Sequence, residues 1–388
     1  MLYALAIVSF ALGFQRVVKR DRAPRLPSDP LAPSHPFVTV IIPARDEEAV
    51  IERCLDAVFA GDYPEDRFEV LVVDDLSQDA TPALVRRVME RVNRAMVPAG
   101  LDEDREAPTR LHLLSMPENL DRAQAHKKRA IEKGIAHARG TVILTTDADC
   151  TVPPGWIGSM AATFGDRTAL VSGPVLYPTG GHAANVTALE FLGLVAVGAG
   201  AVGVGRPNLC NGANVAYRKA VFDALGGFSG IDHLTSGDDE LLMQKIAYTT
   251  DWEVRFCPDP GAAVLTDAPE NTSAFFEQRR RWASKGAHYE HPAVLAVVGT
   301  VYAFYLALLG GLLALPFAPA LAGPLAAAAA LKVLPEAALL GPACRHVGRG
   351  WLMAYFLPAQ LLHIPYVVLM GAAGTLGGYT WKGRRISR

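Results

Sequence analysis

Two carboxylates one residue apart, Asp147 and Asp149, stand directly after the apolar run Thr141–Thr145. Carboxylates with this spacing can hold a hard divalent cation such as Mg²⁺ or Mn²⁺, directly or through water. These ions usually keep several waters and complete their coordination with the phosphates of a substrate. The pattern Asp-x-Asp often occurs by chance. Its position directly after an apolar run is the reason to interpret it as functional. It predicts a metal site for a phosphorylated ligand.

Polar clusters follow two further apolar runs. They are Arg45, Asp46 and Glu47 after Phe37–Ile42, and Asp74 and Asp75 after Glu69–Val73. One acidic residue after a strand usually makes a turn or caps a helix, but three strands that end in such clusters indicate a shared ligand site. No GxxxxGK[ST] sequence is present and no glycine-rich dinucleotide motif follows any of these runs, so both of those phosphate sites are excluded.

Apolar runs alternate with amphipathic stretches from Phe37 onward. The expected strands are 37–42, 69–73, 111–115 and 141–145, and the expected helices are 47–60, 81–92 and 124–138. The first strand is expected to stop at Pro43. This alternation is typical of an α/β fold with a parallel sheet flanked by helices. Ligands of such sheets bind outside the carboxyl ends of the strands, which is where the polar clusters lie.

Composition divides the chain into two parts. It has 51% hydrophobic and 20% charged residues and a net charge of −2, so it is neither disordered nor basic enough to indicate nucleic acid binding. Residues 293–388 contain a single acidic residue, Glu336. The five cysteines are scattered without metal-ligand spacing, which favours reduced residues of a cytosol-facing protein. We therefore expect a soluble domain followed by a membrane domain.

The C-terminal part is expected to enter the membrane. Residues 291–331 contain no Asp, Glu, Lys or Arg, which leaves room for two spanning helices of about 20 residues each. The expected spans are Val294–Leu315, Ala318–Leu340 and a third apolar run, Trp351–Leu376. Lys332 and Glu336 are four residues apart in the second span, so we expect them to face each other inside the helix bundle.

The N-terminal run Leu2–Val18 is also apolar. The basic residues Arg16, Lys19, Arg20, Arg22 and Arg25 follow it instead of preceding it, which favours an uncleaved anchor over a signal peptide and places the following chain in the cytosol. The expected organisation is an anchor (1–20), a proline-rich linker (21–36), a soluble domain (37–285) and a membrane domain (286–388). Three C-terminal spans would place the basic tail (Lys382, Arg384, Arg385, Arg388) outside, so two spans with a re-entrant or interfacial third segment remain an alternative.

Six motifs in order carry a family resemblance. They are Val40-Ile-Ile-Pro-Ala-Arg-Asp-Glu47, Val72-Val-Asp-Asp-Leu-Ser-Gln-Asp79, Thr146-Asp-Ala-Asp149, Cys210-Asn-Gly-Ala-Asn-Val-Ala-Tyr-Arg218, Ser236-Gly-Asp-Asp-Glu-Leu241 and Gln278-Arg-Arg-Arg-Trp282. Over residues 37–285 the chain resembles the family 2 glycosyltransferases, which have a Rossmann-like GT-A domain and membrane helices. It departs from the family in Asp46, where Asn is commoner, and in Asp238-Asp239, where Glu-Asp is usual.

The resemblance implies roles for single residues at the donor side. Asp75, with Pro43, Arg45 and Glu47, would line the nucleoside pocket, and the Asp75 carboxylate would accept from the imide N–H of the base. Asp147 and Asp149 would approach the diphosphate and its Mg²⁺ or Mn²⁺ ion. Lys127 would lie near the phosphates, and Lys128 is the alternative residue for this role. The non-functional interpretation is that Lys127 is an ordinary solvated lysine.

Further roles concern catalysis and the acceptor. The resemblance implies that Asp239 is the catalytic base, and Asp238 is the alternative residue for this role. The non-functional interpretation is that both residues only form the start of a helix. Gln278 and Arg281 would bind the diphosphate and Trp282 would offer an apolar face to the acceptor, unless this stretch is only an interfacial helix. Asn211 and Asn214 would contact sugar or acceptor hydroxyls, unless they belong to a loop that needs its glycine.

The resemblance implies a membrane-bound, inverting transfer of sugar from a nucleotide diphosphate sugar, expected to be a uridine diphosphate sugar. The acceptor would be a lipid or lipid-linked glycan at the cytosolic face of the inner (plasma) membrane. A processive polysaccharide synthase is the alternative, although four apolar segments look too few for a channel. Two hypotheses come from other functional classes: a non-catalytic sugar-nucleotide-binding subunit and a transporter.

Overall fold

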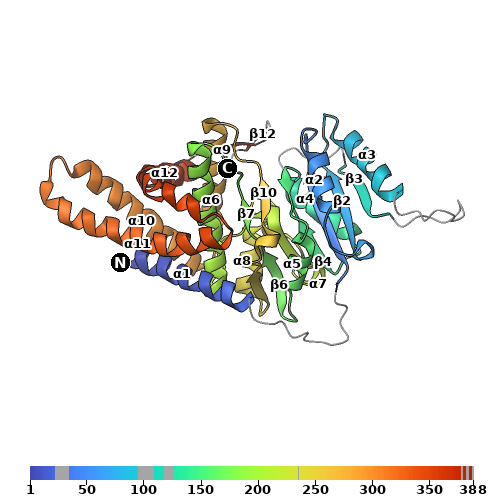
Figure 1. The fold of residues 1–388 in the computed structure, drawn as a ribbon, viewed down its shortest axis with the longest axis horizontal. Helices are drawn as coiled ribbons and strands as arrows, with labels where there is room; N and C mark the ends of the chain where they lie inside the picture. The colour runs from blue at the N-terminus through green and yellow to red at the C-terminus, as the bar shows by residue number, and fades with distance from the viewer. Residues whose placement is uncertain are drawn as a thin grey trace, which may run out of the picture. The chain divides into compact units, whose positions relative to one another are not determined.

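The computed structural model describes residues 1–21, 35–94, 109–117, 126–234, 236–376, 379–381 and 384–386. Most of the expected linker 21–36 and the tail residues Lys382 and Arg388 lie outside this part. The chain forms two compact units, called here the sheet unit and the helical unit (Figure 1). The sheet unit comprises Ala23–Leu176 and Cys210–Asp267, and the helical unit comprises Met1–Arg22, Tyr177–Leu209 and Ala268–Arg388.

A seven-stranded sheet forms the centre of the sheet unit, in the order β3-β2-β1-β4-β8-β6-β9. Its strands are β1 (Val38–Ala44), β2 (Phe68–Asp74), β3 (Leu111–Ser115), β4 (Val142–Thr145), β6 (Thr168–Ser172), β8 (Val215–Arg218) and β9 (Glu253–Phe256). β1 to β4 are mutually parallel, β8 runs antiparallel to its two neighbours, and β9 is parallel to β6. The α/β fold and the four expected strands are confirmed.

The strand order creates a switch point between β1 and β4. From β1 the chain adds β2 and β3 on one side, and β4 then pairs with the other side of β1. In open parallel sheets the crevice at the carboxyl ends of two such strands is where ligands bind. The residues that follow β1 and β4, Arg45 and Asp147, therefore flank the expected binding crevice.

One detail of the first strand was predicted wrongly, because β1 runs through Pro43 to Ala44. β1 pairs with β4 only as far as Ile41, whereas its pairing with β2 continues to Ala44. A proline has no backbone N–H to donate to a neighbouring strand, and it is tolerated where one side of its own strand is unpaired. Pro43 lies in such a stretch, so the strand does not have to end there.

Helices cover the sheet on both sides. They are α2 (Ile51–Phe59), α3 (Thr81–Arg94), α4 (His126–His137), α5 (Trp156–Ala162), α7 (Lys219–Ala224) and α8 (Glu240–Thr249), with the short turns η1 (Glu65–Arg67), η2 (Gly212–Asn214) and η3 (Pro260–Ala262). Ile41 and Leu71 of the sheet share one buried core with Ile131 of α4 and Leu242 of α8. A second, small sheet has the order β5 (Cys150–Thr151), β10 (Val264–Thr266), β7 (Val175–Leu176).

The helical unit consists mainly of long apolar helices. They are α1 (Leu2–Asp21), α6 (His182–Gly203), α10 (Pro292–Ala314), α11 (Ala322–His346) and α12 (Phe356–Leu376), joined by the polar helix α9 (Thr272–Ser284), the turns η4 (Lys285–His288), η5 (Pro319–Leu321) and η6 (Gly350–Tyr355), and the hairpin β11 (Tyr379–Trp381)–β12 (Arg384–Ile386). Among the residues that the structure describes, five segments are long and apolar enough to cross a membrane. Four of them were expected.

The fifth apolar helix, α6, was not anticipated from the sequence. Residues 177–209, expected to be part of one continuous soluble domain, group with the helical unit. The sequence Gly198-Ala-Gly-Ala-Val-Gly203 lies inside α6 and not at a strand-to-helix turn, so it does not form a dinucleotide site. Its glycines let α1 approach: a Cβ on Gly200 would lie 2.3 Å from the Phe10 carbonyl oxygen.

A buried polar cluster joins α10, α11 and α12. The Lys332 ammonium lies 3.0 Å from the Glu336 carboxylate, which confirms that the two side chains face each other. Glu336 also accepts from the Gln360 amide at 2.8 Å and from the Tyr305 hydroxyl at 3.1 Å. The Tyr3 hydroxyl donates to Glu336 as well, so α1 is tied to the same cluster. Ionisable groups in apolar helices are costly unless paired in this way.

Candidate active site

One lysine connects two of the predicted acidic clusters. The Lys127 ammonium, in the first turn of α4, lies 2.7 Å from the Asp147 carboxylate and 3.3 Å from the Asp238 carboxylate. Asp147 follows β4, and Asp238 stands just before α8. Burial on its own would lower the pKa of Lys127, but the two carboxylates outweigh it and raise that pKa. The ammonium therefore stays charged.

Asp239 is bound to the turn that precedes β8. Its carboxylate accepts from the Gly212 amide at 2.9 Å and from the Glu240 amide at 2.7 Å, and it caps α8. Gly212 is closely surrounded, because a Cβ there would lie 3.1 Å from Asp238 and 3.2 Å from the Lys127 ammonium. The structure thus brings Asp147, Asp238 and Asp239 to one place around Gly212 and Lys127.

The predicted nucleoside residues lie at the ends of β1 and β2. The Asp75 carboxylate is 2.7 Å from Nδ1 of His126 and 3.5 Å from Nη1 of Arg45, and Arg45 also donates to the Asp75 carbonyl oxygen at 2.8 Å. His126 and Asp75 are both about 5% exposed. Because His126 precedes Lys127, two successive residues of α4 reach the nucleoside side and the acidic side of the crevice. Sequence reasoning had assigned no role to His126.

Two residues near these contacts have a strained backbone. Asp46, after β1, and Leu76, after β2, have positive φ values of 51° and 60°. The Asp46 amide donates to the Ser77 hydroxyl at 3.0 Å, and the Gln78 amide donates to the Asp46 carboxylate at 2.7 Å. Asp tolerates this conformation far better than a leucine does. Backbone strain of this kind gathers at functional sites, where the surrounding structure holds it.

The other predicted residues of these loops have local partners. Glu47 donates its amide to the Thr81 hydroxyl at 2.8 Å, and Pro43 stays within β1. The Asn211 side chain accepts from the Ala213 amide. Asn214 is fully buried: it accepts from the Trp156 indole at 2.9 Å and donates to two carbonyl oxygens. Its side chain thereby anchors the turn before β8.

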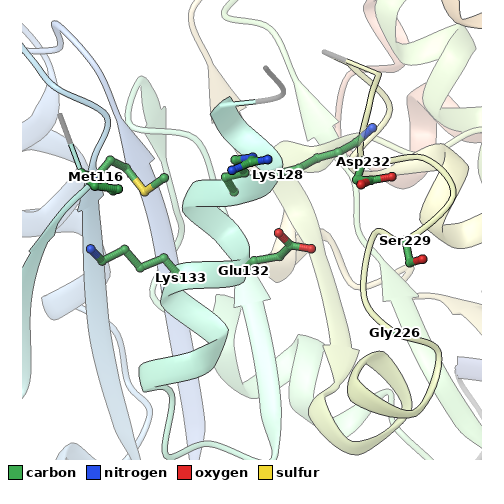
Figure 2. Close-up of a pocket in the computed structure, with 9 residues that line it drawn as sticks. Met116, Lys128, Glu132, Lys133, Gly226, Ser229 and Asp232 are labelled. Atoms are coloured by element: carbon green, nitrogen blue, oxygen red, sulfur yellow. The ribbon is translucent and has the colours of Figure 1, made fainter. Parts of the chain in front are cut away.

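Lys128 has a different environment from that of Lys127. The residue is 2% exposed, and its ammonium donates to the carbonyl oxygens of Ile231, Leu234 and Ser236, the last at 3.0 Å. Figure 2 shows Lys128 reaching from α4 toward the loop that carries Asp232. A cavity of about 600 Å³ lies beside it, lined in part by Glu132 of α4. Lys128 organises the loop that leads to Asp238.

The chemistry of the donors fits a magnesium or manganese ion at Asp147 and Asp149. Both side chains offer hard carboxylate oxygens, one of which lies beside the Lys127 ammonium. Asp149 is held by its neighbours, since its carboxylate accepts from the Cys150 thiol and its carbonyl oxygen accepts from Arg53. Within the described ranges no three His, Cys, Asp or Glu residues gather to hold an ion. Two carboxylates suit an ion that substrate phosphates and water complete.

The third group of predicted residues lies in the helical unit, on α9. The Gln278 side chain accepts from the Tyr177 hydroxyl at 2.9 Å and from Arg279 at 2.6 Å. Arg279 is 2% exposed, ion-paired with Glu190 of α6, and 4.2 Å from the ring centre of Trp282. Sequence reasoning overlooked Arg279 and Glu190; a lone acidic residue in an apolar stretch was the available signal. Arg281 is also on α9, in its last turn.

Matches to protein families decide the classification. The family described as Glycosyl transferase family 2 matches residues 39–225, and the one described as Glycosyl transferase family group 2 matches residues 142–371, more than half of the chain. The chain belongs to glycosyl transferase family group 2. The predicted family is thereby confirmed, whereas the roles of single residues stay predictions.

Curated relatives of this family 2 chain carry glycosyltransferase names. It is 27% identical to a beta-monoglucosyldiacylglycerol synthase of Synechocystis over 71% of this chain and 53% of the relative. It is 30% identical to the glycosyltransferase AglE of Haloferax volcanii over 53% of this chain and 59% of that one. The chain thus spans between half and two thirds of the length of these relatives.

A solved structure resembles the fold. The mannosyltransferase PcManGT of Pyrobaculum calidifontis, determined with GDP-Man and Mn²⁺, aligns with a TM-score of 0.52 at 23% identity. The alignment covers 94% of this chain and 98% of that one. At this level of identity the likeness extends to the fold, a mixed α/β domain with a largely parallel sheet.

Proposed function

We propose that this protein is a membrane-bound, inverting glycosyltransferase. It moves a sugar from a nucleotide diphosphate sugar, expected to be a uridine diphosphate sugar, to a lipid or lipid-linked acceptor at the cytosolic face of the plasma membrane. The observation that carries the proposal is the ammonium of Lys127, held between Asp147 after β4 and Asp238 before α8. Family membership supports the reaction class.

The crevice between β1 and β4 would hold the donor. Asp75 would bind the base through its carboxylate, which Arg45 and His126 orient. Lys127 would shift from the carboxylates toward the diphosphate, because phosphate oxygens carry more charge than one carboxylate. A divalent ion bound at Asp147 and Asp149 would take up charge on the leaving diphosphate.

Asp239 is our candidate for the base that accepts the proton of the acceptor hydroxyl. The amides of Gly212 and Glu240 hold its carboxylate in one orientation. Each carboxylate oxygen has two lone pairs, so an oxygen that accepts from one amide can also accept from a hydroxyl. The proton moves to Asp239 as the hydroxyl oxygen bonds to the anomeric carbon, and the bond from that carbon to the diphosphate breaks. Such a base contributes about 10²–10⁴ in rate.

We also propose binding roles for three residues on α9, which rest on the family resemblance. Gln278 and Arg281 would bind the diphosphate, and Trp282 would contact the acceptor. The buried side chain of Arg279 contacts both Gln278 and Trp282 and so holds them in place on α9. A lipid acceptor agrees with the name of the Synechocystis relative, a beta-monoglucosyldiacylglycerol synthase, and with apolar helices long enough to enter a bilayer.

Donor turnover tests the proposal. Detergent-solubilised protein with Mn²⁺ or Mg²⁺ is incubated with a panel of UDP- and GDP-sugars, with and without lipids extracted from membranes. We expect one donor to release its diphosphate faster when lipid is added, and a labelled sugar to appear in the lipid fraction. Absence of transfer from every donor to every lipid fraction would contradict the proposal.

A polysaccharide synthase is the second candidate, and the fifth apolar helix favours it. A synthase needs enough crossing helices to line a channel, and α6 raises the number of apolar helices above the four expected from the sequence. Product length separates the two candidates. A single-sugar enzyme yields a product with one or a few added sugars at any donor concentration, whereas a synthase yields a polymer.

A further inference from the structure

The side-chain amide of Gln278, on α9, has one end that is fully engaged and one end that is not. Its oxygen accepts from the Tyr177 hydroxyl at 2.9 Å and from Nη1 of Arg279 at 2.6 Å. An amide oxygen has two lone pairs, so these two contacts use its whole capacity to accept. Its NH2 group carries two donors, and neither has a partner among the residues that the structure describes. The NH2 group is therefore the end that Gln278 can offer to a ligand.

Arg279 determines which end of this amide faces inward. A guanidinium only donates hydrogen bonds, so it can contact the oxygen of Gln278 but not the NH2 group. A half-turn of the amide would put NH2 donors against Nη1 of Arg279 and would take one acceptor away from that buried cation. Buried donors without an acceptor are costly. Arg279 thus fixes the oxygen of Gln278 on its own side and leaves the NH2 group pointing away from the guanidinium.

A carboxylate and two aromatic rings hold Arg279 itself. The residue is 2% exposed, and its Nη2 donates to the Glu190 carboxylate of α6 at 2.5 Å. Its guanidinium carbon lies 4.2 Å from the ring centre of Trp282 and 4.7 Å from that of Phe275. Aromatic faces attract a cation, most strongly where water is excluded. The guanidinium therefore has little freedom to turn away from Gln278.

Glu190 ties this group to a third helix. One of its carboxylate oxygens accepts from Arg279, and the other accepts from the Tyr366 hydroxyl of α12 at 3.2 Å. α12 packs against both α9 and α6 within the helical unit (Figure 1). Because different helices hold the two oxygens, the Glu190 carboxylate cannot rotate without losing a contact. The orientation of Gln278 is thus set by α6 and α12 as well as by its own helix.

The free end of Gln278 suits a ligand that accepts hydrogen bonds. Gln278 is half-buried, so a ligand can reach it. Phosphate oxygens are strong acceptors, and hydrogen bonds to a charged oxygen are roughly twice as strong as those between neutral groups. Arg281 stands three residues further along α9, which places its donors beside Gln278 on the surface of the helix. The two side chains together offer only donors to a diphosphate.

We propose that Tyr177, Arg279 and Glu190 are positioning residues that hold the Gln278 amide with its NH2 donors toward a diphosphate oxygen of the substrate. This rests on the role of Gln278 stated under Proposed function. It adds which atoms of Gln278 bind and which other residues fix them. None of the three positioning residues has to touch the substrate, because their effect passes through the orientation of one amide.

Exchange of Gln278 for glutamate tests which end of the amide binds. Gln278→Glu keeps an oxygen that accepts from Tyr177 and Arg279 and replaces only the NH2 group, by a second oxygen, so the fold should be preserved. Gln278→Met removes both ends. UDP and GDP are titrated with Mn²⁺ into the detergent-solubilised protein. We expect the Kd of the nucleotide that binds to rise about tenfold in Gln278→Met and further in Gln278→Glu, where a carboxylate faces the diphosphate. If Gln278→Glu binds as tightly as the wild type, or more tightly than Gln278→Met, the proposal is overturned.

Steady-state kinetics test the positioning residues. Tyr177→Phe removes one hydroxyl, and Glu190→Gln removes the charge that holds Arg279; Glu277→Gln, exposed on the same helix, is the control. We expect the first two variants to raise the KM for the donor about three- to tenfold with little change in kcat, because binding is lost equally from the ground state and the transition state. The control should match the wild type. A merely structural role would lower the amount of active protein, and so the apparent kcat, without moving the KM.

The same two substitutions in a Gln278→Met background decide whether their effect passes through Gln278. No amide is left there to position, so we expect Tyr177→Phe and Glu190→Gln to leave the donor KM of Gln278→Met unchanged. An equal rise in both backgrounds would overturn the proposal, and so would an unchanged KM in the wild-type background. If the wild type transfers sugar and Gln278→Met has a normal donor KM, this inference fails and the reaction class stands. If the wild type transfers no sugar from any donor, the proposed function itself fails.

Discussion

The Lys127 ammonium lies 2.7 Å from the Asp147 carboxylate and 3.3 Å from that of Asp238. This pair of contacts joins the end of β4 to the start of α8, two segments about ninety positions apart in the chain. The two carboxylates keep the Lys127 ammonium charged and close to the end of β4, from where it can move to a diphosphate and stabilise the charge that develops on the leaving group. The same lysine also explains why a glycine stands at position 212, where a side chain would meet it.

Replacing Lys127 by methionine should slow sugar transfer by about 10²–10³ in kcat, the usual cost of removing one group that stabilises transition-state charge. The comparison variant is Lys133→Met, on the same helix, which should transfer at the normal rate. Single-turnover transfer with saturating donor measures the effect. Equal rates for both variants would remove Lys127 from the mechanism.

The pH dependence of the Lys127 contribution follows from its raised pKa. A group with a raised folded-state pKa stabilises fully below its unfolded pKa, about 10.4 for lysine, and loses this effect only as the pH rises through the folded value. The stability difference between the wild type and Lys127→Met should therefore be constant from about pH 6 to 9. Denaturant unfolding in detergent at several pH values measures this difference.

Asp239→Asn should abolish transfer while preserving the fold. Asparagine caps a helix as well as aspartate does, so its oxygen should keep the contact with the Glu240 amide and preserve α8, while its NH2 group cannot accept from the Gly212 amide. Transfer should fall by about 10²–10⁴, with nucleotide affinity unchanged. Asp238→Asn, at the neighbouring position, tests the alternative base. If Asp239→Asn transfers normally and Asp238→Asn does not, the base is Asp238.

Lys128→Met should loosen the loop before Asp238. Three carbonyl oxygens, those of Ile231, Leu234 and Ser236, would lose the buried ammonium. An unsatisfied buried acceptor costs about 1–3 kcal/mol, so the free energy of unfolding should fall by at least that amount. Transfer should fall because Asp238 and Asp239 lose their support, and nucleotide binding should change little.

Lys245→Met is the matched control for that variant. Lys245 also donates to three carbonyl oxygens, those of Leu225, Gly227 and Ser229, in an earlier part of the same loop. It should cost stability without a comparable loss of transfer. Unfolding in denaturant and single-turnover rates measure the two effects. If both variants lose transfer equally, Lys128 has no specific part in holding the acidic pair.

The ion pair between Arg279 and Glu190 should show strong coupling. Arg279→Met alone would leave the Glu190 carboxylate largely buried without its partner, at a cost of about 3–5 kcal/mol in the free energy of unfolding. The double variant with Glu190→Gln should recover much of this loss. Thermal unfolding of the wild type, both single variants and the double variant in one detergent measures the coupling. Additive losses would show that the pair is not energetically linked.

Much of the sheet was predictable because its signals are local. The runs that became β1, β2, β3 and β4 are short, apolar and bounded by turn residues, so periodicity alone located them to within two residues. Pro43 was misjudged because pairing on one side of a strand depends on the neighbouring strand, which a single sequence does not reveal.

The site was predictable as a set of positions but not as a set of contacts. Carboxylates after successive strands pointed to one edge of the sheet, and Lys127 does lie between Asp147 and Asp238. The partners His126 and Arg279 were missed, since both depend on packing between segments distant in the chain. α6 was overlooked because an apolar run inside a soluble domain is easily taken for a core helix.

Nucleotide binding tests the central claim most directly, namely that the acidic clusters of separate segments form one donor site. UDP and GDP are titrated into solubilised protein with Mn²⁺, and into Asp75→Asn, Lys127→Met and the exposed control Asp66→Asn. The account predicts that one nucleotide binds with a Kd that rises at least about tenfold in both Asp75→Asn and Lys127→Met, the loss of a charged contact of about 1.4 kcal/mol or more. The control should bind as the wild type does. Binding that is unchanged in both site variants would contradict the account.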